Sequence, residues 1–294
     1  MRRRAVALAI ILALALGLVP LISPGAIAQG RTEWFLARLH GESEVPGPGD
    51  SDGSGKAYLT LVNNRMCWVL NWFHIGAPTA AHIHAGRATV AGPIVQPLFT
   101  SPQGVPAPIE RAAGCVDLDP ALADAIAARP RNFYVNIHTA RFPAGALRGQ
   151  LLRRLRDFKR IRPVRHYPLI AAPMNGEKEV PPADLDGHGR THLGNAGVRT
   201  TLCFKLFWWD IAPPVAAHIH RGPPRVNGPV VVPFFSAPGG LPSTIDMVGG
   251  CVRDLDFRLT GDIREHPGQY YVNVHTAEFP DGAIRAQIRV DRGD

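Results

Sequence analysis

The sequence lacks several motifs that mark common classes of enzyme and membrane protein. No GxxxxGK[ST] loop occurs in its 294 residues, which excludes a nucleotide site built on that motif. Cysteine occurs four times and never as CxxC, so no thioredoxin-like redox pair is indicated. After the first 28 residues, no apolar run is long enough to span a membrane as a helix. We assign no catalytic residue from the sequence.

The N-terminus has the pattern of an export signal. Three arginines at positions 2–4 precede an apolar run over residues 5–19, and Ala26-Ile27-Ala28 forms a small-x-small cleavage site. We therefore expect residues 1–28 to be a signal peptide and the mature chain to begin at Gln29. An uncleaved anchor is the alternative, although two prolines interrupt the run. The pattern predicts a secreted or cell-envelope protein with no transmembrane segment in its mature chain.

Positive charge is concentrated in one place. The chain has 32 Lys and Arg against 24 Asp and Glu, and residues 153–165 alone contain seven basic residues and one acidic residue. A nucleic-acid-binding protein usually spreads basic and aromatic residues over a folded face, so we expect no nucleic-acid partner. We interpret the basic segment as a solvated linker. Contact with anionic envelope polymers or lipid headgroups is the alternative.

One unit of sequence occurs twice. GESEVP at residues 41–46 returns as GEKEVP at residues 176–181. FYVNIHTARFPAGALRGQL at residues 133–151 returns as YYVNVHTAEFPDGAIRAQI at residues 270–288, with 12 of 19 positions identical. Such repetition predicts two homologous domains. The expected boundaries are 29–154 for the first domain, 155–168 for a basic linker and 169–294 for the second domain.

Each unit is predicted to consist mostly of β-strand. Residues 134–139 and 271–276 alternate apolar and polar side chains, which is the period of a strand with two different faces. Residues 67–73 form a short run rich in aromatic and β-branched side chains. One short helix is expected over residues 120–129, with Asp119 as its N-cap. The pattern predicts an all-β fold with one β-sandwich per domain.

The four cysteines follow the repeat. Cys67 and Cys115 are 48 positions apart, and so are Cys203 and Cys251. Four cysteines allow three pairings, and two copies of one domain favour one bond within each copy. In an exported protein these pairs are expected to be disulfides.

Two histidine pairs are also repeated, as AAHIHAG at residues 80–86 and AAHIHRG at residues 216–222. Residues i and i+2 of a strand share a face, so His82 and His84 should point the same way. His138 lies on the polar face of the alternating strand at residues 134–139. If the strands are neighbours, each unit gathers three imidazoles: His82, His84 and His138 in the first, and His218, His220 and His275 in the second. Three histidines suit copper or zinc.

The same histidines have two other interpretations. We favour hydrogen-bonding braces where strands meet loops, with metal binding and recognition of a different ligand as the alternatives, because duplication copies any of these roles equally well. Arg148 and Arg285 follow tight turns. We interpret them as braces for a carboxylate across the sheet, with anion guidance as the alternative. The candidate carboxylates are Glu42, Glu44, Glu177 and Glu179.

Together these motifs resemble the CHRD domain, an extracellular module common in exported bacterial proteins. The resemblance rests on AHIHAG, GPIV, the cysteine pair and YVNIHTARFPAGALRGQL, and it covers both repeats. It implies two tandem immunoglobulin-like β-sandwich domains with a distant similarity to copper-zinc superoxide dismutase. That enzyme holds copper through an HxH strand pair and further histidines. No motif here marks its bridging histidine or its zinc aspartate.

We therefore expect a secreted, non-enzymatic binding or structural module. If it binds a metal, copper or zinc, the two histidine triads are the ligands. Its expected partner is an extracellular protein or an envelope polymer. The alternative function is a copper-dependent, dismutase-like redox enzyme. A third hypothesis is adhesion to anionic polymers through residues 153–165.

Overall fold

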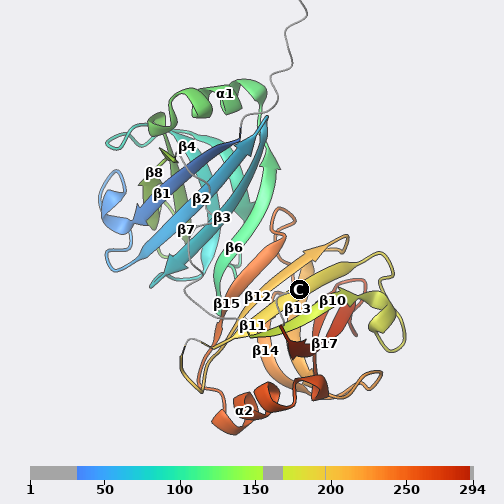
Figure 1. Ribbon diagram of the computed structural model, residues 1–294. Helices are drawn as coiled ribbons and strands as arrows, with labels where there is room; N and C mark the ends of the chain where they lie inside the picture. The colour runs from blue at the N-terminus through green and yellow to red at the C-terminus, as the bar shows by residue number, and fades with distance from the viewer. Residues whose placement is uncertain (1–31, 155–167, 196, 292–294) are drawn as a thin grey trace, which may run out of the picture. The chain divides into compact units, whose positions relative to one another are not determined.

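The computed structural model describes residues 32–154, 168–195 and 197–291 (Figure 1). The predicted signal peptide, residues 1–28, and nearly all of the predicted linker, residues 155–168, lie outside the described residues. Both repeats consist mainly of antiparallel strands, with one short α-helix in each. The predicted all-β fold is thereby confirmed.

The first repeat has its elements in an order that the second repeat follows closely. The elements of the first repeat are β1 (Glu33–His40), η1 (Gly41–Ser43), β2 (Ser54–Val62), β3 (Arg65–Phe73), β4 (Pro78–Ala85), β5 (Ile94–Thr100), β6 (Ile109–Asp117), α1 (Pro120–Ala128), η2 (Pro130–Asn132), β7 (Phe133–Thr139), β8 (Leu147–Gln150) and β9 (Leu152–Arg154). Those of the second are β10 (Leu169–Asn175), η4 (Gly176–Lys178), β11 (His188–Gly194), β12 (Leu202–Trp209), β13 (Pro214–Arg221), β14 (Val230–Ser236), β15 (Met247–Val252), α2 (Phe257–Glu265), η5 (Pro267–Gln269), β16 (Tyr270–Thr276) and β17 (Ile284–Val290).

The strands of each repeat form two antiparallel layers. In the first repeat, β9, β1, β2, β3 and β6 are neighbours in one layer, and β5, β4, β7 and β8 in the other. β8 also pairs with β1 through Arg148 and His40, so the two layers are joined along one edge. In the second repeat, β17 pairs with both β16 and β10 and joins the layers in the same way. This arrangement fits the predicted β-sandwich.

Aromatic side chains fill the space between the layers. Trp68 of β3 and Phe99 of β5 are almost fully buried, with ring centroids 6.0 Å apart. In the second repeat, Phe204 of β12 stacks on Phe234 of β14 at 4.4 Å. Burial of each such ring contributes roughly 1.5–3 kcal/mol. These contacts explain why short aromatic-rich segments form the inner strands.

The cysteines lie opposite each other on neighbouring strands. Cys67 of β3 pairs in register with Cys115 of β6, and Cys203 of β12 with Cys251 of β15. Both pairs are disulfides, and their Cα atoms are 4.0 and 3.9 Å apart. The predicted pairing is confirmed in both repeats.

One helix lies at an end of the strands in each repeat (Figure 1). The predicted α1 forms, and the Asp119 carboxylate accepts hydrogen bonds from the backbone N–H groups of Ala121 and Leu122 at 2.9 and 3.3 Å. α2 was not predicted, because its sequence FRLTGDIRE contains Gly261 and a β-branched Thr260, which have low helix propensity. Asp256 caps it through the Arg258 N–H at 2.8 Å.

The strand β7 is buried on both faces. Val135 and Ile137 are fully buried in the core. The alternating side chains on the other face are also buried, because loops cover that face. Gly86 of one loop donates its backbone N–H to the Asn132 carbonyl at 2.7 Å. A second, polar interior therefore lies on the side of this layer away from the core.

Candidate metal centre

The polar face of the β4 and β7 pair gathers the three histidines of the first repeat. His82 and His84 belong to β4 and His138 to the adjacent β7. One ring nitrogen from each lies within 4.8 Å of the other two. The second repeat places His218, His220 and His275 in the same way on β13 and β16. The predicted proximity of the histidines is confirmed, and their metal role remains a proposal.

The two triads have nearly the same geometry. His82 Nδ1 lies 3.1 Å from His138 Nε2, and His218 Nδ1 lies 3.2 Å from His275 Nε2. The ring centroids of His82 and His84 are 5.7 Å apart, as are those of the HxH pair in the second repeat. Such agreement indicates that the surrounding structure fixes the rings.

Backbone carbonyls determine the tautomers of two imidazoles in each triad. His84 Nδ1 is 3.0 Å from the Gly92 oxygen, and His138 Nδ1 is 3.0 Å from the Pro143 oxygen. A carbonyl only accepts, so each Nδ1 carries the proton and each Nε2 carries a lone pair. Metal-binding histidines are usually oriented by a hydrogen bond of this kind. The second repeat has the same two bonds, from His220 to Gly228 at 2.9 Å and from His275 to Pro280 at 2.9 Å.

One of these lone pairs has nothing to bind within the described residues. His84 Nε2 is buried and has no hydrogen-bond partner, and the same is true of His220 Nε2. Leaving a buried polar atom unpaired costs roughly 1–3 kcal/mol. A metal ion held by three imidazole lone pairs would remove this cost. The residues present therefore fit a transition metal such as copper or zinc.

The imidazoles are neutral at physiological pH. Burial, followed by the proximity of His138 and His84, lowers the pKa of His82 to about 4. The pKa of His218 falls to about 4 for the equivalent reasons. Burial is also the largest cause that lowers the pKa of His84 and of His138. Neutral imidazole is the form that binds metals, so protons do not compete for these nitrogens near pH 7.

Comparison with known families agrees with the repeat. The family model of the CHRD domain matches residues 35–151 and 170–288. The chain belongs to the CHRD domain family. No curated protein and no solved structure matches it. The two CHRD matches fall on the two repeats, while the exact domain limits expected from the sequence remain predictions. Within the described residues, no helix has the length and apolar character needed to cross a membrane.

An arginine and a tyrosine support the HxH pair in each CHRD repeat. The Tyr134 ring stacks on His84 with centroids 4.8 Å apart, and the Tyr134 hydroxyl accepts the Gly92 N–H at 3.2 Å. Arg148 is 1% exposed, and its Nη2 donates to the carbonyls of Arg87 and Val90, both at 2.8 Å. The brace interpretation of Arg148 fits this burial. Its hydrogen-bond partners, however, are carbonyls rather than the carboxylate that we expected.

Arg285 has the equivalent position in the second repeat. It is 2% exposed, and its Nη2 donates to the Val226 carbonyl at 3.1 Å. Its Nη1 donates to Asn227 Oδ1 at 2.9 Å. Both arginines therefore hold the loop that follows the HxH strand.

A buried glutamate lies near each arginine. Glu44 Oε2 accepts from Asn136 Nδ2 at 3.2 Å. Burial raises the pKa of Glu44 to about 7, opposed by the charge of Arg148 and the bond from Asn136. Glu179 repeats this environment, and burial raises its pKa to about 7. The other two candidate carboxylates, Glu42 and Glu177, are exposed.

Sequence reasoning missed the glycine that completes each site. A Cβ on Gly92 would lie 1.5 Å from the Ala85 oxygen, and one on Gly228 would lie 1.6 Å from the Arg221 oxygen. Only glycine lets the loop approach closely enough for its carbonyl to reach the histidine. The repeated Gly-Pro of GPIV and GPVV was the available signal.

Proposed function

We propose that this is an exported protein in which each CHRD repeat binds one copper or zinc ion through its three histidines, as a non-enzymatic binding module. The observation that carries the proposal is the buried Nε2 of His84, which has a lone pair and no partner among the described residues, while the Gly92 carbonyl accepts from Nδ1 of the same ring. His220 has the same environment in the second repeat.

The chemistry of the ligand set also supports this function. Three neutral imidazoles suit Zn²⁺ and copper, and three protein ligands leave a coordination position for a further donor. His82 and His218 are only half-buried, so that donor would approach from their side. A partner protein or envelope polymer could supply it, which agrees with a binding module.

Two competing functions have less support. A purely structural brace would leave the buried Nε2 of His84 unpaired among the described residues, at a cost that a bound metal would remove. A dismutase-like copper-zinc pair needs a second set of ligands beside the first. In the part of the chain that the structure describes, no fourth histidine, cysteine or carboxylate groups with either triad within 4.8 Å. No observation favours the redox enzyme.

Metal content tests the proposal directly. The exported protein is expected to bind two equivalents of copper or zinc by mass spectrometry. The variant H82A/H84A/H138A is expected to bind one, and the variant that also carries H218A/H220A/H275A none. A matched control is H40Q/H74N, which removes two exposed histidines outside the triads. Folded wild-type protein that binds no metal after titration with either ion would contradict the proposal.

Export is tested separately. N-terminal sequencing of the protein recovered from outside the cytoplasm should begin at Gln29. Retention of residues 1–28 on that protein would instead support the uncleaved anchor.

A further inference from the structure

A pocket of about 560 Å³ in the first repeat is lined by four arginines and no carboxylate. The arginines come from three separate segments that meet at this point. They are Arg87 in the loop after β4, Arg129 and Arg131 around η2, and Arg153 in β9. All four are exposed.

The backbone of this pocket is fixed by side chains from β8. Arg148 Nη2 donates a hydrogen bond to the Arg87 carbonyl at 2.8 Å. Gln150 Nε2 donates to the Gly86 carbonyl at 2.6 Å and to the Arg131 carbonyl at 2.9 Å. Two of the three arginine-bearing segments are therefore held in place before any ligand arrives, which reduces the entropic cost of binding.

Among the described residues, most of the positive charge in the pocket has no counter-charge. Arg153 pairs with Glu33 at 2.5 Å. The Arg87 Nε donates to the neutral side chain of Asn132 at 3.4 Å, and its other nitrogens have no side-chain partner in the described part of the chain. No carboxylate of the described residues forms an ion pair with Arg129 or Arg131. At least three guanidinium groups are thus available to an anion.

The second repeat shows that the scaffold does not need these arginines. Gln287 Nε2 makes the same two bonds there, to the Gly222 and Gly268 carbonyls at 2.6 and 2.9 Å. α2 also ends at Glu265 without an arginine after it. The residues at the four equivalent positions are Pro223, His266, Gly268 and Val290. The fold of a repeat therefore does not require these arginines.

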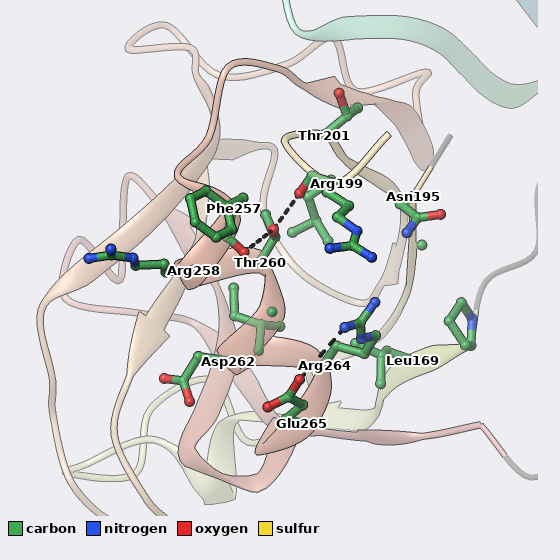
Figure 2. A pocket seen from close by; sticks show the side chains of 15 residues that line it. Leu169, Asn195, Arg199, Thr201, Phe257, Arg258, Thr260, Asp262, Arg264 and Glu265 are labelled. Atoms are coloured by element: carbon green, nitrogen blue, oxygen red, sulfur yellow. Dashed lines mark hydrogen bonds and ion pairs between the residues drawn. The ribbon is translucent and has the colours of Figure 1, made fainter. Parts of the chain in front are cut away.

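Two pockets of the second repeat contain both signs of charge. One, of about 360 Å³, lies beside α2 (Figure 2), and Arg264 there pairs with Glu265 at 3.7 Å. The other, of about 700 Å³, is lined by Lys178 and Arg289 but also by Glu177 and Glu179. The absence of any lining carboxylate distinguishes the pocket of the first repeat.

We propose that this arginine pocket binds a phosphate group, either on a soluble phosphorylated molecule or on a lipid headgroup. Guanidinium groups match phosphate oxygens in a two-point geometry. Several cations in one pocket favour a ligand with more than one negative charge, and a phosphate monoester carries about −1.5 to −2 near pH 7. A carboxylate carries only one. The site is separate from the histidine triad and independent of metal.

Calorimetric titration of metal-free protein with inorganic pyrophosphate tests the site. The variant R87Q/R129Q/R131Q should weaken binding at least tenfold. The control R38Q/K56Q/R65Q removes the same charge from exposed positions in the same repeat and should change the affinity less than twofold. The variant H82A/H84A/H138A should bind pyrophosphate like the wild type, which separates this test from that of metal binding. Equal loss in the two charge variants would overturn the proposal.

Co-sedimentation with vesicles distinguishes the two sources of phosphate. Vesicles of phosphatidylcholine with phosphatidic acid present a phosphate monoester, whereas vesicles of phosphatidylcholine alone do not. Arginine-dependent binding to the first kind supports a lipid headgroup. Binding of pyrophosphate without vesicle binding supports a soluble ligand. Binding of neither probe by the folded wild type overturns the proposal.

Discussion

The guanidinium carbon of Arg148 lies 3.5 Å from the centroid of the Tyr134 ring. The same ring stacks on His84, with 13° between the ring planes. The second repeat has the same relationship, with Arg285 at 3.9 Å from the Tyr271 centroid. A buried cation is thus linked through one aromatic ring to a candidate metal ligand. The orientation of that candidate ligand depends on side chains of β7 and β8 that are not themselves candidate ligands.

Replacement of Arg148 by lysine should destabilise the first repeat. Lysine cannot reach both the Arg87 and Val90 carbonyls while lying flat on a ring. We expect R148K to lower the free energy of unfolding by about 2–4 kcal/mol, measured by urea denaturation. The control is R65K, because Arg65 forms an exposed ion pair with Asp117. This substitution should change the free energy of unfolding by less than about 1 kcal/mol. Equal effects of the two variants would count against the brace.

Removal of the Tyr134 hydroxyl tests the support of His84. Y134F keeps the stacked ring but loses the bond with the Gly92 N–H, so the Gly92 carbonyl is held less firmly against His84 Nδ1. We expect a loss of about 1 kcal/mol in stability. Metal affinity of the first site should fall on the order of tenfold, measured by competition with a chelator. Unchanged affinity in folded Y134F would show that the ring alone positions the imidazole.

The lowered histidine pKa values predict that the contribution of the two triads to the stability of the metal-free protein decreases in acid. In the folded state, His82 and His218 have pKa values of about 4, against about 6.5 when unfolded. Between these values the unfolded chain binds more protons at these histidines, so their contribution to the free energy of unfolding falls as pH decreases from 6.5 towards 4. Urea denaturation at pH 6.5 and pH 5 measures this. Triad variants lacking these histidines should show a shallower dependence.

The buried glutamates predict an effect of opposite sign. The folded-state pKa of Glu44 and Glu179 is raised to about 7, so the folded protein holds their protons between pH 4.5 and 7. Their contribution to stability is therefore lost as pH rises through that range. We expect E44Q/E179Q to retain more of its stability between pH 5 and pH 8 than the wild type does. Parallel curves for the two proteins would contradict this assignment.

Removal of one disulfide should destabilise its repeat. Cys67 and Cys115 close a loop with a sequence separation of 48, which corresponds to about 4 kcal/mol in the chain-entropy model. We expect C67A/C115A to unfold at a lower temperature than the wild type by calorimetry. Addition of a reductant should lower the wild-type transition but leave the C67A/C115A repeat unaffected. An unchanged melting temperature in the variant would contradict the prediction.

Features encoded by short stretches of sequence could be predicted. The alternation of β7, the Asp119 cap and the cysteine spacing each depend on neighbouring residues or on the repeat itself. The proximity of His138 to the HxH pair required only that two alternating strands be adjacent. The alternation and the cap depend on neighbouring residues, and the cysteine and histidine spacings occur in both repeats.

Features that depend on the path of a loop could not be predicted. Arg148 was expected to brace a carboxylate. Glu44 lies near its charge, but the hydrogen bonds of Arg148 go to the Arg87 and Val90 carbonyls in the loop after β4. The arginine pocket joins residues as distant as Arg87 and Arg153, and no pattern in the sequence relates them. Every residue has a backbone carbonyl, so the sequence does not mark which carbonyls accept a hydrogen bond from a distant side chain. Only the structure identifies them.

The two faces of β7 contribute to different parts of the domain, and this has a consequence for how the two repeats can evolve. Val135 and Ile137 belong to the core, whereas His138 faces the polar interior on the other side. Changes in exposed residues beside this polar interior, such as those of η2, can therefore accumulate without disturbing the core. After duplication, the copies could diverge around this side, as Arg131 and Gly268 have, while inheriting the same scaffold. The surface residues of each repeat, and with them any ligand that the repeat prefers, can therefore change independently of the other repeat.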